Sequence, residues 1–371
     1  MPRIRPDRVL TRLADGRELV YYDDRGTARA AAPAPDRRDL PPRPQTPRMR
    51  QDPLSGEWIS HATARQGRVV LPPAESDPLA PQSSGNDSEI PSSYDVAVFE
   101  NRSPSFGPAL PGPGDLLELE GVGIGRSAPS YGRCEVVCFS PEHEGSLGGL
   151  AVERVRTVID AWADRTAALS VLPGIAQVFP FENRGAAVGV TLPHPHGQIY
   201  GYPYVTPRTA RLLAMIEQYD GDLQAELLAF ERAGERVVVA GERWTAFVPY
   251  AARWPVEVHL MPHRQVPDLA GTTEEERAEL ADLYPRLLRA VDRLYDDATP
   301  YIAAWHQAPV HSHRDIARLT LQLTSPRRGA DKLKFLAGSE AAMGAWVADV
   351  GPEEQAARLR AALEEDRHAR A

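Results

Sequence analysis

Apolar residues recur every three or four positions in several segments of the chain, and this spacing is typical of helices that bury one face. The clearest cases are residues 151–170 and residues 273–296, which each predict an amphipathic helix. Residues 206–234 predict a further helical segment, and residues 352–369 predict an Ala-, Glu- and Arg-rich amphipathic helix at the C-terminus. The chain therefore contains long helices in both of its halves.

Polar and turn-forming residues mark the segments between and before these helices. Residues 11–24 contain Asp15 and Gly16 between two strand-like runs, which predicts a β-hairpin. Residues 25–48 are rich in Pro, Ala and Arg and predict an extended linker. Residues 74–93 are polar and predict a loop.

One order of elements, strand, strand, helix, strand, occurs twice along the chain. It runs first between residues 94 and 183 and again between residues 243 and 309, with His143 and His263 at corresponding places. Two copies of one order favour a duplicated unit. We therefore predict an α+β fold with a mainly antiparallel sheet and flanking helices. Its expected parts are an N-terminal hairpin and linker (1–48), an N-terminal domain (49–205) and a C-terminal domain (206–371).

Composition and charge exclude several classes of function. The 371 residues carry 42 Lys and Arg against 51 Asp and Glu, a net charge of −9, which disfavours nucleic acid as a partner. We expect no membrane segment and no secretory signal. Cys134 and Cys138 can share one face of a strand, which suits buried free thiols and a cytoplasmic location.

The densest group of reactive side chains lies in residues 181–200, FENRGAAVGVTLPHPHGQIY. His194, His196 and Gln198 alternate, so on a strand they share one face. The glycines in this segment let backbone N–H groups approach a bulky anion closely. A neutral imidazole there can attack an α-phosphate and form a phosphoramidate, which a second phosphate displaces. The alternatives are that two strand histidines form a metal pair, or that they are simply packed or exposed.

The segment His-Pro-His-Gly-Gln resembles the signature of the galactose-1-phosphate uridylyltransferases, a branch of the histidine-triad superfamily. Further similar segments follow the family's order from about residue 10 to residue 360, at residues 52–59, 140–143, 181–189, 305–309 and 334–338. The resemblance implies duplicated histidine-triad-like domains and a homodimer. It also implies ping-pong transfer of UMP from UDP-glucose to galactose 1-phosphate, the reaction of galactose metabolism.

The same resemblance implies the residues of the site. His196 carries the covalent uridylyl group, and Gln198 hydrogen-bonds the transferred phosphoryl group. His194 is expected to orient His196 or to contact the backbone, and not to be a second nucleophile. The expected substrate-binding residues are Arg65, Arg68, Phe99, Asn101, Asn183, Thr191, Lys334 and Glu340. The arginines are expected at the phosphates, within one chain or across a dimer, and the lysine and glutamate at the hexose phosphate. A solvated basic loop, an apolar strand end and plain surface charge are the alternatives.

The family's zinc site is only partly present in this sequence. Two cysteines of the family are replaced by Asp77 and Ala80, whereas the partner histidines His143 and His194 remain. Alanine cannot bind a metal, so three ligands and a water would resemble an open zinc site and not a closed structural one. We therefore expect no metal cofactor, with the loops held by packing.

A second metal site of the family is also altered. His306 remains, but Thr320 and Gln322 stand where the family has histidines. His311 and His313 lie nearby, in a segment that we expect to be a loop, and we expect them to be solvent-exposed or close to substrate and not metal ligands.

Two substitutions concern the acceptor sugar and leave other functions open. Leu192 replaces the family's asparagine before the motif, and Ser339 replaces a tyrosine, so the hexose pocket is expected to differ. One alternative function is a related nucleotidyltransferase or phosphorylase that uses another sugar phosphate or nucleotide. The other is a nucleotide-sugar binding protein without catalysis.

Overall fold

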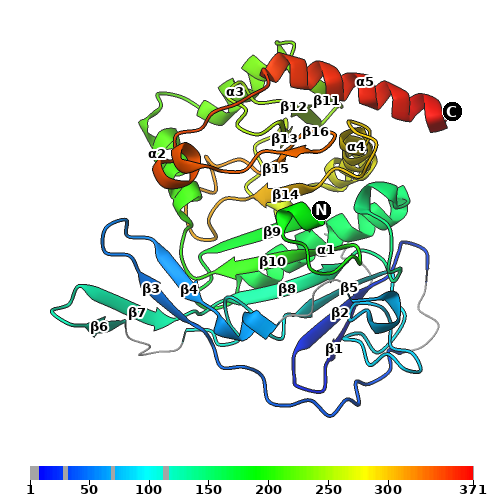
Figure 1. Cartoon of the computed structure of the whole chain (residues 1–371), viewed down its shortest axis with the longest axis vertical. Coiled ribbons are helices and arrows are strands. Elements are labelled where there is room, and N and C mark those ends of the chain that lie inside the picture. Colours follow the sequence, from blue (N-terminus) through cyan, green and yellow to red (C-terminus); the bar gives the residue numbers. More distant parts are fainter. Residues whose placement is uncertain (1–7, 28–31, 68–71, 112–116, 371) are drawn as a thin grey trace.

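A computed structural model describes residues 8–27, 32–67, 72–111 and 117–370 and shows one long antiparallel sheet with helices packed against it (Figure 1). All eleven strands of this sheet pair antiparallel with their neighbours. In spatial order the strands are β1 (Arg8–Arg12), β2 (Glu18–Tyr22), β5 (Val96–Glu100), β8 (Arg133–Cys138), β10 (His196–Tyr202), β9 (Gln177–Arg184), β14 (Tyr301–His306), β15 (Thr320–Ser325), β13 (Val256–Pro262), β12 (Trp244–Phe247) and β11 (Val237–Ala240). The α+β fold with a mainly antiparallel sheet is therefore confirmed.

Two smaller sheets accompany the long one. A four-stranded sheet consists of β4 (Trp58–His61), β3 (Arg48–Gln51), β7 (Gly125–Pro129) and β6 (Glu118–Glu120), and its tips project from the body of the molecule (Figure 1). The pair β16 (Arg327–Gly329) and β17 (Lys332–Leu333) forms a short ribbon.

Within the described residues, five α-helices occupy the segments in which the sequence predicts helices. They are α1 (Val152–Ser170), α2 (Pro207–Gln218), α3 (Leu223–Arg232), α4 (Glu274–Asp292) and α5 (Pro352–Arg370). Helix α4 begins with a capping box between Thr273 and Glu276, which satisfies backbone N–H groups of the first turn. The segment predicted as one helical stretch at 206–234 is two helices, because the chain turns at Gly221, whose φ is +137°.

The main core lies between the long sheet and helices α1 and α4. Trp162 of α1 and Tyr284 of α4 pack near Trp305 of β14, with ring centroids 6.1 to 6.4 Å apart. All three side chains are at most 2% exposed. Because these helices cover one face of the sheet, functional side chains on the strands must point from the opposite face.

The two halves of the long sheet are related by an approximate twofold arrangement about the junction of β9 and β14. A single row of paired residues crosses eight strands, in the order Phe99, Val136, Gln198, Phe181, Ala304, Gln322, His259 and Phe247. Phe181 and Ala304 form the central pair, so Gln198 and Gln322 occupy equivalent positions on either side of it. The duplication predicted from the order of elements is therefore present in the sheet.

Several local predictions are confirmed. Strands β1 and β2 form the N-terminal hairpin, and Cys134 and Cys138 are buried on β8 and form no disulfide bond in the described part of the chain. His311 and His313 lie in the loop before β15, where His313 Nε2 is 2.8 Å from a carboxylate oxygen of Glu217. Among the residues that the structure describes, no helix is both long enough and apolar enough to cross a membrane.

Candidate active site

A cavity of about 580 Å³ opens on the face of the sheet opposite α1, over the first repeat. It lies between the strands β5, β8, β9 and β10 and the loops that follow them. Of the residues expected to form a site, it is lined by Arg65, Phe99, Asn101, Asn183, Thr191, His196 and Gln198. Residues far apart in the sequence therefore meet where the histidine motif begins.

His196 is the first residue of β10, and its ring is held by the backbone of the motif itself. Its Nδ1–H donates to the carbonyl oxygen of His194 at 2.7 Å, which leaves the lone pair on Nε2. The next residue, Gly197, packs so closely that an added Cβ would lie 2.8 Å from the Phe139 ring and 2.9 Å from the Phe181 carbonyl oxygen. Only glycine fits at position 197, because any side chain would collide with Phe139 and the Phe181 backbone.

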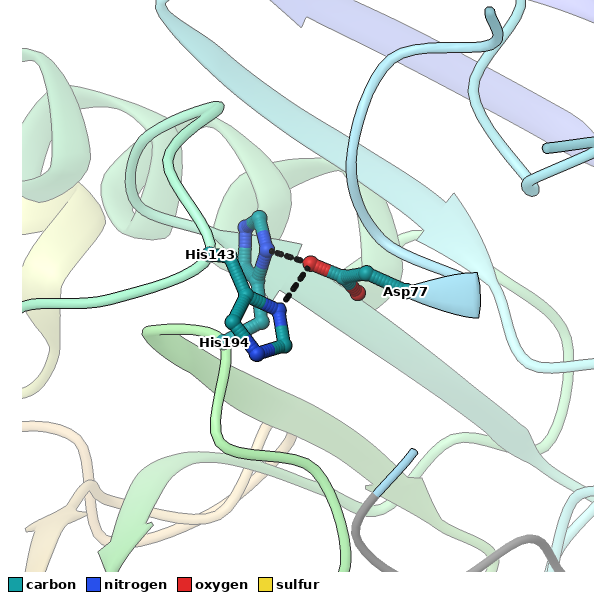
Figure 2. A group of neighbouring side chains, drawn as sticks. All are labelled: Asp77, His143 and His194. Carbon is teal, nitrogen blue, oxygen red and sulfur yellow. Dashed lines mark hydrogen bonds and ion pairs between the residues drawn. The ribbon is translucent and has the colours of Figure 1, made fainter. Parts of the chain in front are cut away.

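His194 lies beneath the cavity and shares one carboxylate with His143. Figure 2 shows that both rings point toward Asp77, whose Oδ2 is 2.7 Å from His194 Nδ1 and 2.9 Å from His143 Nδ1. Burial alone would raise the pKa of Asp77, but the two histidines and the Leu79 backbone N–H lower it to about 2. An ionised Asp77 therefore joins the loop at residues 74–93 to the histidine motif.

The other ring nitrogen of His194 is also held. His194 Nε2 lies 2.8 Å from the Ser140 carbonyl oxygen and 3.1 Å from the Tyr94 hydroxyl, and the side chain is fully buried. Tyr94 in turn donates to the Leu79 carbonyl oxygen at 2.7 Å. His194 is therefore placed to fix the backbone that accepts the His196 hydrogen bond, and it does not line the cavity.

The group of Asp77, His143 and His194 does not fit a closed structural zinc site. Three possible ligand atoms converge there, but Ala80 supplies no fourth. The two oxygen–nitrogen distances of 2.7 and 2.9 Å are direct hydrogen bonds. Two ligands of a tetrahedral zinc ion stand about 3.3 Å apart, given zinc–ligand bonds of about 2.0 Å. In this geometry both histidines hydrogen-bond the Asp77 carboxylate directly.

The second metal site of the family is replaced by a different set of contacts. Thr320 donates its hydroxyl hydrogen to the Arg318 carbonyl oxygen, and Gln322 accepts a hydrogen bond from Arg208. A guanidinium group at this position disfavours any bound cation. Of the expected ligands only His306 remains, so the residues present do not fit a metal.

The substrate-binding residues that reach the cavity come from four separate segments. Arg65 lies on the 3-10 helix η1 (Thr63–Gly67) of the same chain, and its buried Nη1 has no hydrogen-bond partner among the described residues. Phe99 is 4% exposed at the end of β5, where Asn101 follows and accepts a hydrogen bond from the Ser103 backbone. A buried guanidinium nitrogen beside a cavity can bind a phosphate oxygen.

Two of the expected substrate-binding residues, Lys334 and Glu340, do not line this cavity. Lys334 and Glu340 pair with each other at 3.3 Å, which lowers the pKa of Glu340, and Lys334 also donates to the Val347 carbonyl oxygen. Arg68 lies outside the described residues.

Some lining residues were not anticipated from the sequence. Arg102 and Tyr200 line the cavity, and Glu89 reaches it while pairing with Arg17 at 2.6 Å and with Arg38 at 3.1 Å. Arg102 follows Asn101 directly and Tyr200 continues the alternation of the motif, so the pattern itself could have identified them. Glu89 belongs to the loop at residues 74–93, whose path no local pattern predicts.

Comparisons with known proteins agree with this geometry. The family model of the galactose-1-phosphate uridyl transferase N-terminal domain matches residues 43–206, and that of the C-terminal domain matches residues 214–371. A galactose-1-phosphate uridylyltransferase of Streptomyces lividans is 50% identical over 308 residues, which are 81% of this chain and 80% of that protein.

Two further relatives cover almost the whole of their own length. A galactose-1-phosphate uridylyltransferase of Thermotoga maritima is 35% identical over 84% of this chain and 97% of its own. A solved structure described as a uridylyltransferase has a TM-score of 0.75 and 30% identity, and it covers 86% of this chain and 99% of its own. The chain belongs to the galactose-1-phosphate uridylyltransferase family, a family of nucleotidyltransferases.

Proposed function

We propose that this chain transfers UMP from UDP-glucose to galactose 1-phosphate through a covalent uridylyl group on His196. The observation that carries the proposal is the hydrogen bond from His196 Nδ1–H to the His194 carbonyl oxygen. It assigns the lone pair to Nε2 of a half-buried ring that lines the cavity. An imidazole held in this tautomer is a nucleophile that needs no separate base.

In the first half-reaction, His196 Nε2 attacks the α-phosphorus of UDP-glucose. The nitrogen–phosphorus bond forms, and the bond from that phosphorus to the oxygen of glucose 1-phosphate breaks. The oxygen leaves with the electron pair, and the imidazole ring gains a positive charge. The hydrogen bond from Nδ1–H to the His194 carbonyl strengthens as this charge develops, so it stabilises the transition state more than the ground state.

The reaction also requires that the negative charge on the transferred phosphoryl group is stabilised. Gln198 lies two residues beyond His196 on the same face of β10, so its amide N–H can donate to a phosphoryl oxygen. The buried Nη1 of Arg65 supplies positive charge at the same cavity. In the second half-reaction a phosphate oxygen of galactose 1-phosphate attacks the uridylyl group, and His196 leaves as a neutral imidazole.

We expect UDP-glucose and galactose 1-phosphate to give UDP-galactose with ping-pong kinetics. Initial rates at several fixed concentrations of the second substrate should give parallel lines in double-reciprocal plots, because the first product leaves before the acceptor binds. Intersecting lines would contradict a covalent intermediate. Turnover of ADP-glucose with inorganic phosphate, and none with UDP-glucose, would favour the phosphorylase alternative.

The acceptor half of the site is proposed to come from a second copy of the chain. Lys334 and Glu340 do not line the cavity of their own chain, and the segment that carries them exposes large apolar side chains. Phe335 is 78% exposed, Met343 81% and Val347 56%. A second copy that covers this apolar segment would form a homodimer and bring a lysine and a glutamate to its partner's cavity.

Mixing two inactive variants tests this arrangement. Lys334→Ala and His196→Asn each remove activity alone, but a reassembled heterodimer would contain one site with an intact His196 and an intact Lys334. Because half of the randomly mixed dimers are heterodimers, we expect roughly a quarter of wild-type activity. Absence of recovery, with subunit exchange shown by native mass spectrometry, would place Lys334 in the site of its own chain.

The hydrogen-bonded group of Asp77, His143 and His194 is proposed to work without metal. Its three side chains satisfy one another directly, and no fourth ligand is available in the sequence at Ala80. Elemental analysis of untagged protein should find well below one equivalent of zinc, and a chelator should leave the rate unchanged. Zinc near one equivalent, lost together with activity on chelation, would overturn this proposal. A cytoplasmic location is also proposed, because the two buried cysteines form no disulfide bond in the described residues.

A further inference from the structure

A second cavity lies on the same face of the sheet, over the second repeat. Its volume is about 460 Å³, and its lining includes His306 of β14, Gln322 of β15 and residues from the first turns of α2. None of these residues takes part in the proposed transfer reaction. The cavity is therefore a second candidate site on this chain.

The sheet registers show that this cavity is the structural counterpart of the catalytic one. Gln322 pairs with Ala304 as Gln198 pairs with Phe181, and these two pairs are related across the β9–β14 junction. Two residues before Gln322 on β15, Thr320 therefore stands where His196 stands on β10. The second site thus has a glutamine at the position equivalent to Gln198 and a threonine at the position equivalent to the nucleophile.

Three arginines line this cavity, and their charge is not balanced by ion pairs. Arg208, Arg211 and Arg253 are exposed residues, and none forms an ion pair with a carboxylate in the part of the chain that the structure describes. Glu57 is the acidic residue in the lining. Burial and the nearby charge of Arg253 lower the pKa of Arg208, and Glu257 offsets this only in part.

Other arginines of this protein are neutralised by a carboxylate. Arg165, for example, lies 2.7 Å from a carboxylate oxygen of Glu135, and this carboxylate helps to raise the pKa of Arg165. The two guanidinium groups of Arg208 and Arg253 instead act on each other as like charges. Such an arrangement is stabilised when an anion lies between them.

The backbone and neutral side chains around the arginines also suit an anion. Helix α2 has twelve residues, and its N-cap Thr206 makes no side-chain capping bond, so the N–H groups of its first turn remain directed to this end. Arg208 donates to Gln322, which holds its guanidinium at the cavity, and Arg253 lies 5.6 Å from the centre of the Trp346 ring.

We propose that this second cavity binds the phosphate group of a small phosphorylated ligand without reacting with it. Planar guanidinium groups bind phosphate oxygens in pairs, and the volume leaves room for a sugar next to the phosphate. The Thr320 hydroxyl donates to the Arg318 carbonyl oxygen and is not poised for attack on phosphorus. The site thus binds sugar phosphates or inorganic phosphate and has no transfer chemistry.

Binding to the full chain tests this proposal, with a double variant of the site and a control variant outside it. Arg208→Gln with Arg253→Gln removes the site, and Arg286→Gln is a control on α4, where Arg286 forms an exposed ion pair with Asp282. Isothermal titration with inorganic phosphate and, separately, with glucose 1-phosphate is carried out in the Arg65→Gln background, which weakens binding at the catalytic cavity. We expect the double variant to lose at least tenfold in affinity, because each charge-assisted hydrogen bond contributes that much.

The position of the bound group is checked by soaking crystals with tungstate, a phosphate analogue with a strong anomalous signal. A peak between Arg208 and Arg253 supports the proposal, and a peak only at the catalytic cavity overturns it. Unchanged affinity in the double variant also overturns it. Tighter binding of glucose 1-phosphate identifies a sugar phosphate as the ligand, and equal affinities identify the phosphate group alone.

Failure of this proposal can be told apart from failure of the proposed reaction. The double variant keeps His196, Gln198 and Arg65, so it should still form a UMP adduct from UDP-glucose at the wild-type rate. Its melting temperature should not fall, because removal of two like charges relieves repulsion. Phosphate should raise the melting temperature of the Arg286→Gln control more than that of the double variant.

Discussion

His196→Asn is expected to lower kcat for UDP-galactose formation by at least about 10⁴-fold, because it removes the nucleophile of both half-reactions. The asparagine amide is of similar size and can still donate to the His194 carbonyl oxygen, so the fold should be retained. Affinity for UDP-glucose should change little, because the other lining residues remain. Steady-state rates and equilibrium binding of UDP-glucose measure these two effects separately.

The control for this substitution is a histidine outside the cavity. His311→Asn changes an exposed ring in the loop before β15 and should leave kcat within about twofold of wild type. If His196→Asn retained more than a hundredth of the wild-type rate, the uridylyl group would have to pass through another residue or go directly to the acceptor.

Asp77→Ala is expected to reduce both stability and turnover. It leaves the Nδ1–H groups of His143 and His194 without their shared acceptor, and for the fully buried His194 an unsatisfied group costs about 1–3 kcal/mol. The melting temperature should fall by several degrees. Because His194 holds the carbonyl that orients His196, kcat should fall by about 10- to 100-fold while KM for UDP-glucose changes less.

Asp77→Asn separates positioning from charge. Its amide oxygen can still accept from one imidazole, so it should recover part of the lost stability and rate. The slope of the pH–rate profile should also differ between these variants and wild type if Asp77 acts through His194. If Asp77→Ala lost stability but kept full kcat at low temperature, Asp77 would serve the fold alone.

Much of the fold follows from local patterns in the sequence. The spacing of apolar residues placed α1 and α4 to within a few residues, and the repeated order of elements predicted the twofold relation of the two halves. What the pattern could not provide is the pairing of β9 with β14. That pairing joins the repeats into one sheet, and it depends on tertiary packing around Trp162 and Trp305.

The sequence likewise predicts one part of the candidate site and not the other. Alternation in the motif predicts that His196 and Gln198 share a face, and both line the cavity. Alternation also places His194 on that face, but Pro195 precedes the strand and His194 turns down to Asp77. The acceptor-binding role of Lys334 and Glu340 rests on resemblance alone, because the fold of one chain does not bring them to the cavity.

The most direct test of the central claim is the intact mass of the protein after incubation with UDP-glucose alone. The account predicts one added UMP per chain, absent in His196→Asn and present in His311→Asn. Galactose 1-phosphate should then discharge the adduct and release UDP-galactose. No adduct on the wild-type chain under conditions of full turnover would contradict a uridylyl-histidine intermediate, and no adduct together with no turnover would favour a nucleotide-sugar binding protein.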